Sequence, residues 1–154
     1  MKTKIFVTVG STYPFDRLIK EMDIIGKNKK YEIFAQIGES NYIPKNIAFE
    51  KILSYDKAQE KIKWADLVIS HAGVGSIIDI LAANKKLILF PRLKEHGEAV
   101  DNHQLEICQA LQKKYKITII FKNKDLSKCL QDNYSKPRKT NKKSLVNEIK
   151  KLII

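Results

Sequence analysis

Short apolar runs alternate along the chain with stretches whose apolar residues recur every three or four positions, and this alternation constrains the fold most. The first pattern is typical of buried parallel strands and the second of helices lying on a core. The expected strands are residues 4–9, 31–36, 66–70, 86–90 and 116–121, with a short apolar stretch at 47–49. The expected helices are residues 15–25, 54–64, 77–83, 100–113, 125–130 and 144–153. Such βαβ units predict an α/β fold, a Rossmann-like parallel sheet with helices on both faces.

The length of 154 residues suits one Rossmann-like domain, which we expect over residues 1–133. An exposed basic linker, residues 134–143, and a C-terminal helix within 144–154 are expected to follow. The apolar runs are too short to span a bilayer, and no signal-peptide pattern opens the chain. Cys108 and Cys129 form no disulfide framework, so we expect a cytoplasmic location.

The positive charge is concentrated at the C-terminal end. Residues 113–154 hold 13 basic and 3 acidic side chains, which is +10 of the chain's net charge of +12. This asymmetry favours a polyanionic partner for that end, either nucleic acid or an anionic lipid surface. A lysine-rich face that is simply solvated explains the same composition. The rest of the chain, at +2, is expected to carry the site.

Ligands of open parallel sheets bind outside the carboxyl ends of the strands, so the loops after the strands are the candidate sites. The first such loop is Gly10-Ser11-Thr12, directly before an expected helix. Free backbone N–H groups and the helix dipole favour a phosphate there. An ordinary turn with a capping hydroxyl fits the same residues.

The second loop, residues 71–76, reads His-Ala-Gly-Val-Gly-Ser and is the stronger candidate for a diphosphate. It is no dinucleotide fingerprint, because Ile78 occupies the third glycine position, and it is neither a Walker A loop nor a nucleophile elbow. Asp79 follows Ser76 by three residues and is well placed for a ribose diol. Compensation of the helix dipole is the structural alternative for Asp79.

The third loop, residues 92–104, is dense in Glu, Asp, Asn and Gln, which suits a polyhydroxylated ligand. The three histidines of the chain, His71, His96 and His103, lack the spacing of zinc ligands, so we expect no metal site. No pattern supports a Ser/His/Asp hydrolase.

Taken together, these motifs resemble the C-terminal domain of the family 28 glycosyltransferases over roughly residues 4–112. The resemblance rests on the segments Phe6–Thr12, Phe15–Leu18, Ser70–Ser76 and Pro91–Glu106. It is greatest to the small two-chain type, which includes the soluble subunit of the dolichol-pathway N-acetylglucosaminyltransferase and short bacterial enzymes of capsule and exopolysaccharide synthesis. The loop that begins at Arg92 is more similar to the bacterial branch.

The resemblance implies the donor half of a GT-B hexosyltransferase, which transfers a sugar from a UDP-sugar with inversion and without a tightly bound metal or other cofactor. It implies roles for several residues, although the family more often has Glu where Asp79 stands. Gly10 and Ser11 would line the diphosphate; Gly73, Gly75 and Ser76 would meet the phosphates beside His71; Asp79 would hold the ribose; and Glu98, Asp101, Asn102 and Gln104 would contact the sugar.

The same resemblance implies a membrane-anchored, Rossmann-like acceptor-binding subunit as partner and a lipid-linked glycan as acceptor. The general base is expected on that partner, with His71, His96 and Glu98 as fallback candidates. The basic end would face an anionic membrane surface, which places the chain peripherally at the inner face of the membrane. The apolar side of the last helix would dock the partner through Leu145, Ile149 and Leu152.

Galactose or glucuronic acid is the favoured sugar, because of the bacterial-branch loop, with glucose and N-acetylglucosamine left open. The alternative function is a nucleic-acid-binding α/β module that uses the basic end. Against this hypothesis, the sequence has no RRM, KH or helix-turn-helix signature, and aromatic residues are scarce among the C-terminal lysines. We therefore expect no nucleic-acid partner.

Overall fold

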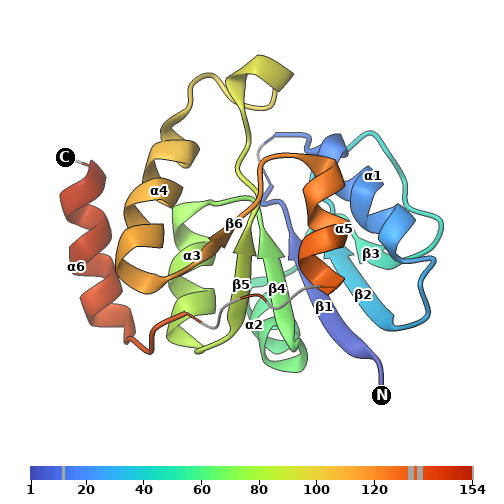
Figure 1. Cartoon of the computed structure of the whole chain (residues 1–154), viewed down its shortest axis with the longest axis horizontal. Coiled ribbons are helices and arrows are strands. Elements are labelled where there is room, and N and C mark those ends of the chain that lie inside the picture. Colours follow the sequence, from blue (N-terminus) through green and yellow to red (C-terminus); the bar gives the residue numbers. More distant parts are fainter. Residues whose placement is uncertain (12, 132–133, 135–136, 154) are drawn as a thin grey trace.

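The computed structural model describes residues 1–11, 13–131, 134 and 137–153. Its centre is one parallel sheet of six strands in the order β3-β2-β1-β4-β5-β6 (Figure 1). The strands are β1 (Thr3–Thr8), β2 (Tyr31–Gln36), β3 (Ala48–Glu50), β4 (Leu67–Ser70), β5 (Lys86–Leu89) and β6 (Thr118–Ile119). The chain winds outward from β1 in one direction and from β4 in the other, so the sheet is doubly wound, and the expected Rossmann-like parallel sheet is confirmed.

Helices cover both faces of this sheet (Figure 1). They are α1 (Asp16–Ile25), α2 (Tyr55–Trp64), α3 (Val74–Ala82), α4 (His103–Tyr115), α5 (Asn123–Gln131) and α6 (Lys142–Ile153). The apolar sides of α1 and α5 share one core cluster with one face of the sheet. Those of α2, α3, α4 and α6 share a second cluster with the opposite face. The sheet is therefore packed between two buried apolar layers, and the loops at the ends of its strands are left to form the site.

Local signals set several element ends. The Ser54 hydroxyl caps α2 by accepting a hydrogen bond from Lys57 N at 3.2 Å. α3 begins at Val74, three residues before the expected start, because the extended backbone of Gly73 already provides the N-cap. α4 begins at His103 rather than residue 100, after a 3₁₀ turn η1 (Lys94–His96) that Gly97 ends with a φ of +68°. That turn was not expected.

The C-terminal helix packs against its own chain. Leu145 and Ile149 are 0% and 2% exposed and belong to the cluster formed with α3 and α4. The expectation that they dock a partner is therefore wrong, because their apolar surface is already buried; only Leu152, at 42%, remains exposed. Within the residues described, no helix has both the length and the apolar character needed to cross a bilayer.

The segment before α6 is only partly an exposed linker. Pro137 is buried, and Arg138 N donates a hydrogen bond to Tyr115 O at the end of α4, at 3.0 Å. Arg138 and Lys139 are exposed, as expected. Lys136, the expected boundary at residue 133 and the last residue, Ile154, lie outside the described residues, as does Thr12 of the first loop.

Candidate functional site

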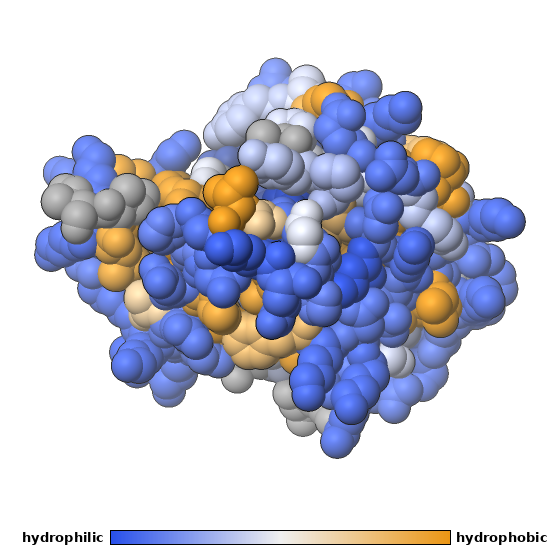
Figure 2. Space-filling view, turned by 90° about the horizontal axis from the view of Figure 1, so that it is seen from above, coloured by the Kyte–Doolittle hydropathy of each residue, from blue (hydrophilic) through white to orange (hydrophobic). Residues whose placement is uncertain are grey.

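The two glycine loops meet at the carboxyl edge of the sheet. The register pairs Thr8, at the end of β1, with Gln36 of β2 on one side and Ser70 of β4 on the other. The chain leaves β1 and β4 toward opposite faces of the sheet, and this crossover is where such sheets bind ligands. Figure 2 looks down on this edge, whose surface is largely hydrophilic with isolated hydrophobic patches.

His71 is buried between these loops at 7% exposure. Its Nδ1 lies 3.2 Å from Thr8 O, and because a carbonyl only accepts, Nδ1 carries the proton and Nε2 is left as an acceptor. Burial, and then the Arg92 charge, lower the pKa of His71 to about 4. The imidazole is therefore neutral at pH 7, and the role of His71 as a fallback base stays a prediction.

The imidazole also explains why glycines flank it. A Cβ on Gly73 would lie 2.3 Å from His71 Nε2, and one on Gly10 would lie 2.9 Å from it. Gly10 also adopts a φ of +72°, which side chains disfavour. The sequence therefore needs glycine at both positions to bring the two loops together over the histidine.

The first turn of α3 presents free backbone donors. The N–H groups of Val74, Gly75 and Ser76 find no acceptor in the part of the chain that the structure describes, and Gly73 provides no side-chain cap. A Cβ on Gly75 would meet nothing within 4 Å. Three donors and the positive end of the helix dipole are thus open to an anion, as expected for this loop.

A cavity of about 290 Å³ lies beside this turn, on the α2 and α3 side of the sheet. Gly75, Ser76 and Asp79 line it together with Phe6, Thr8, Gln36, Leu53, Tyr55, Ala58, Gln59, Ile62 and Ile80. The Asp79 carboxylate, one turn into α3, has Lys142 Nζ 3.7 Å away. Gln59 Nε2 is buried without a hydrogen-bond partner among the described residues. The cavity therefore joins the anion-binding turn to a carboxylate and a free amide.

Glu98, expected to contact the sugar, forms an ion pair and a hydrogen bond within the chain. It is 8% exposed and forms a two-pronged ion pair with Arg17 of α1, with Nε–Oε2 at 2.8 Å and Nη2–Oε1 at 2.9 Å. Its Oε1 also accepts a hydrogen bond from Leu93 N at 3.1 Å. These three hydrogen bonds leave Oε2 with an unused lone pair, since a carboxylate has about four acceptor sites. Glu98 thus braces the chain, and its roles as fallback base and sugar ligand stay predictions.

The other expected sugar contacts also brace the third loop. Gln104 Oε1 accepts from Arg92 N at 3.1 Å, and Asn102 Oδ1 accepts from Lys94 N at 3.1 Å. Asp101 Oδ1 accepts from His103 N at 3.0 Å. None of the three lines the cavity beside Asp79. The sugar role of Asp101, Asn102 and Gln104 stays a prediction.

From the sequence, Arg92 was identified only as the first residue of the third loop, yet in the structure it is a central residue of the carboxyl edge of the sheet. Its guanidinium is 3% exposed, and Nη2 donates to Val9 O at 2.6 Å and to Tyr13 O at 2.7 Å. The Phe15 ring lies 5.0 Å from its Cζ. A charged residue three positions after the end of the apolar strand β5, at the carboxyl edge, was the signal for Arg92. Arg17, Tyr55 and Gln59 were also missed, and Tyr55 and Gln59 had no comparable signal.

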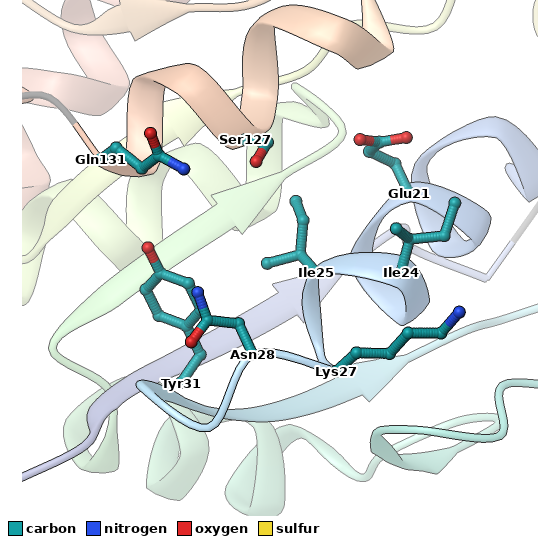
Figure 3. A pocket seen from close by; sticks show the side chains of 8 residues that line it. All are labelled: Glu21, Ile24, Ile25, Lys27, Asn28, Tyr31, Ser127 and Gln131. Carbon is teal, nitrogen blue, oxygen red and sulfur yellow. The ribbon is translucent and has the colours of Figure 1, made fainter.

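Further hollows lie elsewhere in the part of the chain that the structure describes. One, of about 290 Å³, is lined by Pro14, Asp16, Arg17, Gly97, Glu98 and the exposed His96, so two of the fallback candidates for the general base lie beside it. Another, of about 310 Å³, lies between the end of α1 and α5 (Figure 3). Its lining includes Ile25 and Tyr31, at the end of α1 and the start of β2, so it opens toward the opposite edge of the sheet. No group of three or more His, Cys, Asp or Glu side chains in residues 1–11, 13–131, 134 and 137–153 could hold a metal ion.

The fold defines an α/β domain of the Rossmann-like class, matching the C-terminal half of the GT-B arrangement. A solution structure of ALG13 shares the fold, with a TM-score of 0.67 at 21% identity over 96% of this chain and 94% of that one. The pattern of the glycosyltransferase family 28 C-terminal domain matches residues 4–153. The chain therefore belongs to this family, and the match extends beyond the expected residues 4–112.

Two curated relatives bear on the sugar. The human UDP-N-acetylglucosamine transferase subunit ALG13 is 35% identical over 123 residues, which are 71% of this chain but only 10% of the human protein. The Geobacter metallireducens UDP-N-acetylglucosamine--N-acetylmuramyl-(pentapeptide) pyrophosphoryl-undecaprenol N-acetylglucosamine transferase is 33% identical over 75 residues, 49% of this chain and 20% of that enzyme. Both names specify N-acetylglucosamine. Galactose or glucuronic acid was favoured from the sequence instead, and neither name mentions capsule or exopolysaccharide synthesis.

Proposed function

We propose that this chain is the donor-binding subunit of a glycosyltransferase that uses UDP-N-acetylglucosamine. The observation that carries the proposal is the joining of three free N–H donors at the start of α3 to a cavity lined by Asp79. A diphosphate fits the donors, and a ribose diol fits the carboxylate one turn further along. The same cavity, which the free Gln59 amide also lines, has room for the uracil ring. The names of the relatives support N-acetylglucosamine as the transferred sugar.

The proposed chemistry is inverting transfer without a tightly bound metal. The acceptor hydroxyl attacks the anomeric carbon while the bond to the UDP oxygen breaks and negative charge develops on the departing diphosphate. Oriented N–H groups at the start of α3, together with the helix dipole, stabilise that charge. Since His71 is neutral with its pKa at about 4 and Glu98 is held by Arg17, the general base is assigned to the partner.

The proposed partner is a membrane-anchored, Rossmann-like subunit that binds a lipid-linked glycan acceptor. The names of the two relatives support it: one is called a subunit, and the other names a pyrophosphoryl-undecaprenol substrate. The chain would lie peripherally at the cytoplasmic face, where its basic end meets anionic lipid. Vesicle flotation tests the lipid contact with wild type and a variant in which Lys139, Lys142 and Lys143 are changed to Gln. Weaker binding of the variant to anionic vesicles is expected, and equal binding would remove the lipid contact from the proposal.

Isothermal titration with UDP, UDP-N-acetylglucosamine, UDP-galactose and UDP-glucuronic acid tests the donor site. Saturable binding is expected, tightest for UDP-N-acetylglucosamine, and Asp79→Ala should weaken it about tenfold. Asp125→Ala is the matched control, because Asp125 lies in the first turn of α5 on the other face of the sheet and should change affinity less than twofold. Binding of RNA or DNA with a steep salt dependence, and none of UDP, would replace the proposal with the nucleic-acid-binding alternative.

A further inference from the structure

The buried guanidinium of Arg92 has no anion of its own. Its Nη2 bonds go to two neutral carbonyl oxygens, and its Nε has no hydrogen-bond partner within the described part of the chain. Glu98 is the carboxylate that acts on Arg92 electrostatically, but it is already paired with Arg17. The three side chains together therefore leave one positive charge beneath the carboxyl edge. Burying such a charge is costly unless an anion compensates it.

The loop above Arg92 is oriented by these bonds. Arg92 holds the carbonyl oxygens of Val9 and Tyr13, and Gln36 Nε2 donates to Gly10 O at 3.4 Å. In a trans peptide the N–H points opposite to the carbonyl, so Gly10 N–H points away from Arg92 and Ser11 N–H points away from the Gln36 amide. Neither of these two N–H groups has an acceptor among residues that the structure describes. Two further donors thus face outward at the loop beside the start of α3.

The positive charge of Arg92 would act on an anion at these donors across one peptide group. A hydrogen bond from a cation to a carbonyl oxygen polarises the peptide and strengthens the N–H on its other side. One peptide group and two hydrogen bonds separate the guanidinium from an anion held by Gly10 N–H, a span of less than about 10 Å. At that distance, each negative charge on the ligand should raise its affinity for the site on the order of tenfold through attraction to Arg92.

We infer that Arg92 is a positioning residue that makes this site selective for the diphosphate of the ligand: it holds the Val9–Gly10 peptide with its N–H directed away from the guanidinium, and it supplies positive charge beneath the bound anion. The inference rests on the proposed function and adds a residue to it. It assigns Arg92 no direct contact with the ligand, because the Val9–Gly10 peptide lies between them. Its effect must therefore grow with the negative charge of the ligand and vanish for a neutral nucleoside.

Titration of the full chain with uridine, UMP and UDP tests this inference. Arg92→Gln should weaken UDP binding about tenfold or more, UMP binding less, and uridine binding less than twofold. Arg92→Lys should restore most of the UDP affinity, because it returns the charge under the loop. Lys94→Gln is the matched control: it removes the same charge from an exposed side chain two residues away and should change UDP affinity less than twofold.

Glu98→Gln is an independent variant that should change UDP affinity in the opposite direction. It removes the carboxylate that offsets the Arg92 charge, while one oxygen remains for Arg17, so UDP affinity should rise about threefold with uridine affinity unchanged. This variant decides the question if Arg92→Gln does not fold. Equal losses for UDP and uridine in Arg92→Gln, or weaker UDP binding in a folded Glu98→Gln, would overturn the inference. Failure of the wild type to bind UDP would instead overturn the proposed function.

Discussion

Arg17 and Glu98 form a two-pronged ion pair across 81 positions of the sequence, with N–O distances of 2.8 and 2.9 Å. Arg17 also donates to Phe121 O at 2.7 Å and to Pro91 O at 3.3 Å. One side chain of α1 thereby holds the segments that follow β5 and β6. The carboxyl edge of the sheet is a braced surface, and its flanking loops depend on one guanidinium for their relative positions.

Replacing Arg17 should therefore destabilise the chain strongly. Arg17→Met leaves Glu98 buried without its partner, and we expect the free energy of unfolding to fall by about 3 kcal/mol, measured by urea denaturation. Lys20→Met, an exposed position on the same helix, is the control and should cost less than about 1 kcal/mol. Equal stability of the two variants would contradict the bracing role.

Buried His71 predicts a loss of stability at mildly acidic pH. The unfolded chain takes up a proton at this side chain near pH 6.5, whereas in the folded chain its pKa is about 4. Falling pH therefore favours unfolding between about pH 6.5 and 4, by up to about 1.4 kcal/mol per pH unit, and has no such effect above that range.

Urea denaturation at several pH values measures this dependence. His71→Asn should flatten it, because the Asn amide can still donate to Thr8 O but does not titrate. His96→Asn is the control, since His96 is exposed and forms no ion pair with the residues that the structure describes, so its replacement should leave the wild-type pH profile intact. A His71→Asn profile as steep as that of the wild type would show that another group is responsible.

Gly75→Ala should separate stability from binding. A Cβ there meets no atom within 4 Å, and Ala favours helix, so the free energy of unfolding should rise by up to about 1 kcal/mol. The same methyl group enters the space where the diphosphate would approach the first turn of α3, so UDP affinity should fall. Thermal melting and UDP titration of the same sample measure both effects. Unchanged UDP affinity would place the ligand elsewhere.

The packing of α6 on its own chain predicts unequal costs for two leucines. Leu145→Ala should lower the free energy of unfolding by about 2–5 kcal/mol, because Leu145 is fully buried in the cluster with α3. Leu152→Ala, on the same helix, should cost much less, since Leu152 is 42% exposed. Similar small losses for both would mean that α6 does not dock as described.

The sequence predicted the sheet and its loops because both depend on local patterns. Apolar periodicity located the strands and helices, and glycines marked the turns at Gly10 and Gly73. The roles of Glu98 and Arg92 could not be predicted in this way, since each depends on partners far along the chain, such as Arg17 and Val9. The burial of Leu145 was missed for the same reason: an amphipathic helix shows that it has an apolar side, not what covers that side.

Amide chemical-shift mapping by NMR during a titration with UDP tests the central claim most directly. Saturable shifts are expected at Gly10, Ser11, Gly75, Ser76 and Asp79, which belong to the two loops at the carboxyl edge and the first turns of α3. Shifts confined to the lysine-rich C-terminal residues, or the absence of any saturable shift, would contradict the assignment of this edge as the UDP-sugar site.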